Sequence, residues 1–290
     1  MSQIPAAGLL TPAPTRIMGV LNVTPDSFSD GGRWLDHAAA VEHGRRMMAE
    51  GADLVDVGGE STRPGSVRPS EQEELDRVIP VVENLVGHGI PVSIDTMRAT
   101  VAAAAVGAGA ALVNDVSGGL ADDAMPSTVA GLGVPFVAMH WRGLLADPQE
   151  EPHYEDVVGE VRDELAARVE ALVEEGIARE LVVLDPGFGF SKDAGHNWVL
   201  LRGLAAITGL GLPVLVGTSR KRFLGRLPLH TAAPAEPRTD GEPTAPDERD
   251  AATAATSLLA AQAGAWAVRV HDIPSTRDAL AVHRLTEAAR

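Results

Sequence analysis

The sequence predicts an α/β fold of the (β/α)8 TIM-barrel type, a parallel eight-stranded barrel enclosed by outer helices. Eight apolar, β-type runs cross the chain, helix-like stretches rich in Ala, Leu and Glu separate them, and 290 residues suit one barrel. The expected strands are Arg16–Val23, Ala52–Val57, Ile90–Ile94, Ala111–Val113, Pro135–Met139, Leu181–Leu184, Pro213–Gly217 and Trp266–Val270.

The stretches between the strands carry helix signals. Asp36 is an expected N-cap, and Ser70 stands three residues before Glu73, which is the pattern of a capping box. The expected helices are Asp36–Gly51, Ser70–Gly87, Met97–Gly107, Asp123–Gly131, Tyr154–Gly176, Gly195–Thr208, Arg249–Gly264 and Pro274–Ala288.

The predicted domain organisation is simple. Residues 1–15 contain three prolines and lack a basic segment followed by an apolar core, so we expect a disordered N-terminal lead and no signal peptide. Residues 16–290 are expected to form a single barrel domain. A Pro-rich, polar stretch, Pro228–Glu248, interrupts the strand–helix rhythm and is expected to be a loop insertion, either a plain surface excursion or a lid.

The composition excludes several classes of function. A net charge of -16 and a pI of about 4.9 argue against nucleic-acid binding, which depends on phosphate neutralisation. No apolar run approaches the length of a membrane span, and the chain has no cysteine, so neither disulfides nor thiol chemistry are available. We therefore expect a cytoplasmic protein that binds neither nucleic acid nor a membrane.

Polar residues follow three of the expected strands, where the active site of a barrel enzyme lies. They are Asp95, Asn114 and Asp185. Any one of them could instead cap the next helix, but all three doing so is a weaker explanation. An ionised, partly buried carboxylate needs a partner, so these ends suit a donor-rich heterocycle such as a guanidine-like edge.

Basic residues follow the seventh and eighth strands. Ser219–Arg222 holds three consecutive cations, and Arg269 and His271 stand two apart on one strand, so they point to the same face. Loops in this position often bind phosphate in barrels, and Arg, Lys and His supply the donors. The alternative is a solvated basic turn together with a core Arg ion pair.

Two long polar loops, at 22–32 and 58–65, follow the first two strands and suggest a pair that closes over a ligand. The chain has no P-loop, no HExxH motif and no GxGxxG that opens a helix after the first strand, and its histidines lack ligand spacing. A structural zinc is not expected, whereas Mg²⁺ carried by a diphosphate needs few protein ligands.

Taken together, these motifs resemble those of dihydropteroate synthase, an enzyme family of bacterial folate synthesis. The similarity extends over residues 17–272 in the family's order. The matching stretches are Ile17–Gly32, Asp56–Gly65, Ser93–Arg98, Asn114–Gly119, Met139–Arg142, Leu184–Lys192, Val216–Gly225 and Arg269–Asp272.

This resemblance implies that 6-hydroxymethyl-7,8-dihydropterin diphosphate and p-aminobenzoate condense to 7,8-dihydropteroate and diphosphate. It implies pterin binding by Asp95, Asn114, Asp185, Lys221 and Arg269, with Arg269 stacking on the ring. It implies diphosphate binding by Asn22, Arg63, Arg269 and His271, with Asn22 also contacting Mg²⁺, the implied cofactor. It implies a p-aminobenzoate pocket made by Phe28, Thr62, Pro64, Phe190, Lys221 and Arg222. The expected catalytic residues are Asp30, Asp95, Lys221 and Arg63.

The implied chemistry begins with C–O cleavage, because the electron-rich pterin can delocalise the resulting cation, which carboxylates then stabilise. Closing loops would exclude water. The resemblance also implies inhibition by sulfonamides and a homodimer packed through helices near the C-terminal end. Two alternatives stay open: a non-catalytic pterin-binding paralogue, and a pterin-type methyltransferase, against which the basic ends of the last two strands weigh.

Overall fold

In the computed structural model, residues 6–24, 32–60, 68–143, 152–227 and 242–289 are described. Within these ranges the chain forms one parallel sheet of eight strands in the order β6-β5-β4-β3-β2-β1-β8-β7. A parallel bridge between Leu184 and Val214 joins the two outer strands of that order, so the sheet closes into the predicted barrel. The strands are β1 (Arg16–Asn22), β2 (Leu54–Gly58), β3 (Val92–Asp95), β4 (Leu112–Asp115), β5 (Phe136–Met139), β6 (Val182–Asp185), β7 (Leu215–Val216) and β8 (Ala267–Val270).

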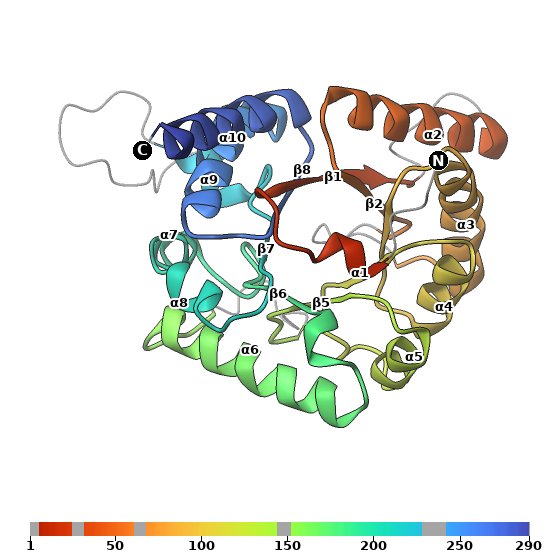
Figure 1. The fold of residues 1–290 in the computed structure, drawn as a ribbon, viewed down its shortest axis with the longest axis horizontal. Helices are drawn as coiled ribbons and strands as arrows, with labels where there is room; N and C mark the ends of the chain where they lie inside the picture. Colours follow the sequence, from red (N-terminus) through yellow and green to blue (C-terminus); the bar gives the residue numbers. More distant parts are fainter. Residues whose placement is uncertain (1–5, 25–31, 61–67, 144–151, 228–241, 290) are drawn as a thin grey trace.

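The helices that follow residue 31 form an outer ring around the barrel, whereas α1 (Ala6–Leu9) is not part of that ring (Figure 1). The helices of the ring are α2 (Gly32–Glu50), α3 (Glu71–Gly87), α4 (Ala99–Gly107), α5 (Met125–Leu132), α6 (Val157–Glu174), α7 (Ala194–Arg202), α8 (Ala205–Thr208), α9 (Asp250–Gln262) and α10 (Ile273–Ala288). Ser70 caps α3 with the full capping box that the sequence predicts. The predicted helix 195–208 is instead two helices, because the chain turns at Gly203, where a Cβ would lie 2.6 Å from Val158 Cγ2.

Two apolar layers hold the barrel together. Val, Leu and Ile side chains on the outer surface of the strands pack against the helices, for example Leu21, Val57 and Ile94. A second cluster fills the interior near the amino ends of the strands, and it draws one residue from each of seven strands. These residues are Met18, Leu54, Leu112, Val137, Val183, Leu215 and Ala267. The barrel is therefore filled with side chains at its floor, leaving the opposite mouth for polar groups.

The N-terminal segment corrects one expectation. The part of 1–15 that the structure describes is not a disordered lead: α1 lies across the middle of the barrel (Figure 1), and Leu9 is only 3% exposed. The indole Nε1 of Trp266 donates to the carbonyl of Leu9 at 3.0 Å, and Thr15 Oγ1 donates to the carbonyl of Ala265 at 2.8 Å. Leu9 packs with the interior cluster. The apolar surface buried there offsets the conformational entropy that the segment loses when it becomes ordered.

The Pro-rich insertion, Pro228–Glu248, is only partly described. Its positions 228–241 lie outside the described residues. Its end is anchored, since the amide of Thr244 donates to Gly225 at 3.1 Å and Arg249 Nε donates to Thr244 at 2.8 Å.

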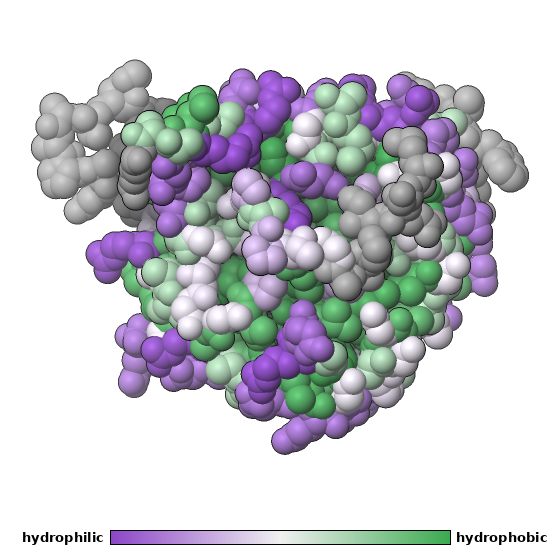
Figure 2. Space-filling view, viewed as in Figure 1, coloured by the Kyte–Doolittle hydropathy of each residue, from purple (hydrophilic) through white to green (hydrophobic). Residues whose placement is uncertain are grey.

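The surface of the protein is seen from the floor of the barrel in Figure 2, where hydrophilic residues gather around the outer rim. No helix in the described ranges combines the length and apolar character that crossing a membrane requires.

Candidate active site

The mouth of the barrel collects polar side chains from strands far apart in sequence. Asp95 and Asn114 are register partners at the ends of β3 and β4, and Asp185 ends β6 beside Met139 of β5. Arg269 enters from β8, and its Nη2 donates to Asp95 Oδ2 at 2.6 Å. The structure therefore brings together the four strand-end residues that the sequence nominates for the pterin.

A fifth residue, Asp56 of β2, links these groups and was missed by the sequence reasoning. Its Oδ2 accepts from Arg269 Nε at 2.6 Å and from Asn114 Nδ2 at 3.0 Å, and the residue is fully buried. Its Oδ1 is also buried, and no partner for it is found among the described residues. A lone carboxylate inside the apolar run Leu54–Gly58 was the available signal, because burying it requires a cation or strong donors.

Burial and mutual charge set the protonation behaviour of the mouth. Burial first, and then the nearby Asp56, raise the pKa of Asp95 to about 7, although Arg269 opposes the shift. Burial likewise raises the pKa of Asp185. Burial disfavours the charged form of Arg269, but Asp56 and Asp95 outweigh it and hold the pKa of this guanidinium above its ordinary value. The mouth therefore holds a fixed cation beside Asp95 and Asp185, whose neutral forms burial favours.

Lys221 and Phe190 form the wall next to Asp185. The ammonium of Lys221 lies 3.9 Å from the centroid of the Phe190 ring. Burial, followed by the charge of Arg269, lowers the pKa of Lys221 to about 8. The turn after β6 is tied to the carboxylate, because the amide of Gly187 donates to Asp185 Oδ1 at 2.7 Å. Lys221, Phe190 and Asp185, all nominated from the sequence, therefore lie together on this side of the mouth.

The three consecutive cations after β7 do not share one set of partners. Arg220 has a left-handed backbone (φ 58°), and its guanidinium binds Asp250 of α9 at 2.7 and 2.8 Å. Arg222 is exposed at the start of a 3-10 turn (Arg222–Arg226). Of the three, Lys221 is the one placed against Asp185 and Arg269.

Asn22 and His271, both nominated for the diphosphate, come together at the ends of β1 and β8. They line one hollow of about 550 Å³ with residues of α2, among them His43 and Arg46. Ser219 orients His271: its hydroxyl lies 2.9 Å from Nδ1 and accepts from the His271 amide at 3.1 Å. The sequence placed Ser219 in this region without assigning it that role.

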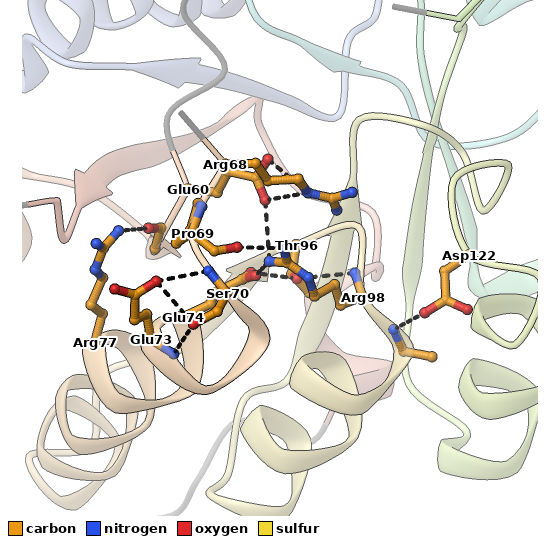
Figure 3. Close-up of polar contacts among 12 residues, drawn as sticks. Glu60, Arg68, Pro69, Ser70, Glu73, Glu74, Arg77, Thr96, Arg98 and Asp122 are labelled. Carbon is orange, nitrogen blue, oxygen red and sulfur yellow. Dashed lines mark hydrogen bonds and ion pairs between the residues drawn. The ribbon is translucent and has the colours of Figure 1, made fainter. Parts of the chain in front are cut away.

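Five nominated residues, Phe28, Asp30, Thr62, Arg63 and Pro64, lie outside the described residues. The stem of the second loop is described, and it is pinned by Arg98 (Figure 3), whose Nη1 donates to Glu60 at 3.3 Å and whose Nη2 donates to the Pro69 carbonyl at 2.6 Å. Arg98 also pairs with the fully buried Glu74. Arg68 binds Glu60 at 3.0 Å, which ties the two sides of the loop together.

The described residues contain no cluster of three or more His, Cys, Asp or Glu side chains arranged to hold a metal ion. An ion that arrives with a diphosphate needs only one or two protein ligands, and Asn22 offers an amide oxygen at the place where His271 would meet the phosphates.

Comparisons with known proteins agree with this geometry. A family model described as pterin binding enzyme matches residues 18–271. The dihydropteroate synthase of Mycobacterium leprae is 55% identical over 271 residues, covering 93% of each protein. That of Bacillus subtilis is 43% identical over 260 residues, covering 89% of this chain and 84% of the relative.

Solved structures extend the likeness to three dimensions. Xanthomonas albilineans dihydropteroate synthase with 4-aminobenzoic acid superposes with a TM-score of 0.84 at 44% identity, covering 98% of this chain and 97% of that one. The same enzyme in complex with 7,8-dihydropteroate gives a TM-score of 0.80 at 43% identity, with coverage of 96% and 95%.

Proposed function

The chain belongs to the dihydropteroate synthase family of pterin-binding enzymes, and we propose that it condenses 6-hydroxymethyl-7,8-dihydropterin diphosphate with p-aminobenzoate. The products are 7,8-dihydropteroate and diphosphate. The observation that carries the proposal is the joined array of Asp56, Asp95, Asn114 and Arg269 at the barrel mouth, with Asp185 and Lys221 beside it. Structural relatives bound to 4-aminobenzoic acid and to 7,8-dihydropteroate support the choice of substrates.

The pterin fits the array through its amino and ring N–H groups. Asp185 offers a carboxylate whose second oxygen is not used by Gly187, and Asn114 and Asp95 add acceptors across the mouth. A guanidine-like edge that donates two hydrogen bonds to one carboxylate gains both charge complementarity and direction. Lys221 lies next to Asp185 and donates toward the pterin carbonyl and ring nitrogen in this arrangement. The flat guanidinium of Arg269 offers a face for stacking.

The reaction proceeds by loss of diphosphate before or during attack. The C–O bond of the CH2 group breaks, its electron pair leaves with the diphosphate, and the positive charge spreads into the pterin ring. Asp95, and Asp30 from the first loop, stabilise that charge electrostatically. The amine nitrogen of p-aminobenzoate then forms the C–N bond and releases a proton to solvent. Since an aromatic amine is neutral at pH 7, no strong general base is needed.

The leaving group is held by cationic side chains. Arg63, Arg269 and His271 are the diphosphate ligands in this proposal, and Asn22 would hold a Mg²⁺ ion that arrives with the diphosphate. When bound, Mg²⁺ would neutralise charge that develops on the departing diphosphate. The Ser219 hydroxyl contacts Nδ1 of the His271 ring and also accepts from the His271 backbone amide, so the chain positions one phosphate donor before the substrate enters.

The second substrate enters beside Phe190 and Lys221. Phe28, Thr62, Pro64 and Arg222 complete the p-aminobenzoate pocket in this proposal, and sulfonamides, which share its shape and charge, compete there. A solved structure of Yersinia pestis dihydropteroate synthase contains a sulfonamide drug complex.

The proposal also includes a homodimer and a cytoplasmic location. Exposed apolar side chains on α9 and α10 suit such a dimer, among them Leu259 and Leu285.

The test is diphosphate release by purified protein mixed with the pterin diphosphate and Mg²⁺, with and without p-aminobenzoate. Release that depends on p-aminobenzoate and yields dihydropteroate supports the proposal. Lys221→Ala and Asp185→Asn are each expected to lower turnover at least about 100-fold. Near-normal turnover in both variants would remove these residues from the mechanism. Pterin diphosphate binding without product would instead indicate a non-catalytic binding protein.

A further inference from the structure

The whole chain contains only two lysines, Lys192 and Lys221, whereas all other basic side chains apart from histidine are arginines. Both lysines flank the turn that follows β6. Lys221 belongs to the site described above. Lys192 is buried, at 8% exposure, and has no part in the proposed mechanism. A lysine in so arginine-rich a chain points to a position where a guanidinium does not fit the geometry.

The ammonium of Lys192 has a partner in each of its three donor directions. Its Nζ donates to the carbonyl of Gly187 at 3.1 Å, to the carbonyl of Phe190 at 3.2 Å and to Nδ1 of His140 at 3.0 Å. An ammonium has three N–H bonds radiating from one nitrogen, so all three are used. A planar guanidinium spreads its donors along a fork and does not reproduce this pattern.

His140 links Lys192 to the outer helix α6. Burial, followed by the charge of Lys192, lowers the pKa of His140 to about 4, so the ring is neutral at pH 7. When Lys192 is protonated its ammonium only donates, so Nδ1 accepts and the ring proton resides on Nε2. That Nε2–H faces Glu164 of α6 at 3.0 Å, and Arg142 Nε binds the same carboxylate at 3.2 Å. The turn is thus tied to β5 and α6.

The turn itself needs such an external support. Gly187, Gly189 and Ser191 all have left-handed backbones, with φ of 71°, 74° and 46°. This conformation is unfavourable for Ser191, and the glycines gain no stabilisation from side chains. A Cβ on Gly187 would lie 2.5 Å from the carbonyl oxygen of His140, so the turn packs directly on the end of β5.

We propose that Lys192 is a positioning residue, which fixes the Gly187–Phe190 turn and thereby the Asp185 carboxylate and the Phe190 ring that receive the two substrates. The inference rests on the proposed function. Gly187 connects Lys192 to Asp185: its carbonyl accepts from Lys192, while its amide donates to Asp185 at 2.7 Å. Phe190 is held through its carbonyl, and its ring lies under the ammonium of Lys221.

The first test replaces Lys192 by Met, which keeps the stem and removes all three donors. Lys192→Met is expected to raise the KM for both substrates, and the Kd of the pterin diphosphate by calorimetry, at least about tenfold, because small misplacements weaken aligned contacts. The kcat is expected to change less than the KM. Arg16→Met is the matched control: Arg16 donates to the carbonyl of Thr11 at 2.9 Å at the barrel floor, so its loss should leave both KM values unchanged.

Rescue separates positioning from a general loss of structure. Since the chain has no cysteine, Lys192→Cys creates one thiol, which 2-bromoethylamine converts in denaturant to a side chain with a terminal ammonium. After refolding, this product should regain most of the lost affinity. The same variant capped with iodoacetamide should not, and wild-type protein taken through the procedure controls for refolding.

The outcomes are distinct. A folded Lys192→Met protein with KM and Kd within twofold of wild type overturns the inference, as does equal recovery with either alkylating reagent. If the wild-type protein itself forms no dihydropteroate, the proposed function fails, whereas calorimetric binding of the pterin diphosphate still tests the role of Lys192.

Discussion

Arg269 of β8 reaches across the barrel mouth to Asp95 of β3, with 2.6 Å between Nη2 and Oδ2. In the sheet, β1 and β2 separate the two strands, so the ion pair spans the interior instead of linking neighbours. Asp56 of β2 lies between them and accepts from Nε of the same guanidinium. Charge on opposite walls is thereby fixed in one orientation before any substrate arrives, which is the condition for electrostatic catalysis.

Asp56→Asn tests that arrangement. The variant keeps the shape but removes the charge that faces Arg269, leaving Asp95 as its carboxylate partner. We expect kcat/KM to fall by at least about 100-fold and the free energy of unfolding to fall by about 3 kcal/mol. Steady-state kinetics and urea unfolding measure the two effects.

Asp53→Asn is the matched control for this prediction. Asp53 is an exposed carboxylate just before β2, and it accepts from the amide of Ile17 at 2.8 Å. Its replacement should leave kcat/KM near the wild-type value. Equal loss of activity in both variants would contradict a special role for Asp56.

The two lysines are predicted to titrate far below the ordinary lysine range. Burial lowers the pKa of Lys192 to about 7 and that of Lys221 to about 8. Asp185 and Glu164 oppose the shift at Lys192, while Arg142 and Lys221 add to it. Protein labelled with [13Cε]lysine should give two side-chain resonances, both shifting between about pH 6 and 9. Lys192→Arg removes one resonance and assigns both.

Catalysis should follow the same titration. As Lys221 loses its proton above about pH 8, its attraction for the diphosphate-bearing pterin weakens, and the KM for that substrate is expected to rise. Two resonances that stay constant up to pH 10 would contradict the buried, neutral-prone state of these amines.

His140 is expected to make stability depend on pH. Its folded-state pKa is depressed to about 4, whereas the unfolded value is about 6.5, so between these values only the unfolded chain binds the proton. The stabilisation is complete above pH 6.5 and is lost as pH falls toward 4. The free energy by which wild type exceeds His140→Gln should therefore shrink by about 2 kcal/mol from pH 8 to pH 5. Urea unfolding at both values measures it, and a constant difference would refute the assignment.

Leu9→Ala separates the floor of the barrel from its mouth. Leu9 is buried against the interior cluster, so the substitution should lower the free energy of unfolding by about 2–4 kcal/mol through lost burial and a cavity. Turnover should stay unchanged, since the floor carries stability and the mouth carries chemistry. Leu120→Ala, at a residue 50% exposed, is the control and should cost little. A Leu9 variant as stable as wild type would show that α1 does not contribute to the core.

The sequence predicted those parts of the site that interrupt a pattern. Asp95, Asn114 and Asp185 each end an apolar run, and strand ends meet at one mouth in a closed parallel barrel. Asp56 escaped because it lies inside a strand, where its pairing with Arg269, 213 residues away, is a tertiary contact. Glu74 gave no comparable signal, because it lies on a helix with many charges, yet it is fully buried against Arg98.

The remaining differences between prediction and structure come from backbone conformation at Arg220 and from tertiary contacts at Leu9 and Lys192. Arg220 was grouped with Lys221 and Arg222 by adjacency, but its left-handed φ directs it to Asp250. The composition of residues 1–15 favoured disorder, because composition does not show that Leu9 packs in the barrel interior beside Trp266. Lys192 appeared only as part of a matching stretch, because its three acceptors are two carbonyls and a distant histidine that no local pattern reveals.

The closure of the barrel has a consequence for how the protein opens. β7 has two residues, and a single bridge between Leu184 and Val214 joins β6 to the last part of the sheet. Backbone amides along this seam should exchange their hydrogens with solvent sooner than those of β1 and β2, which pair over five residues. Asp185 and Lys221 stand on opposite sides of the seam, so a ligand that contacts both would bridge it. Bound substrate would then slow hydrogen exchange most strongly at the junction between β6 and β7, where the barrel without substrate has the fewest backbone pairings.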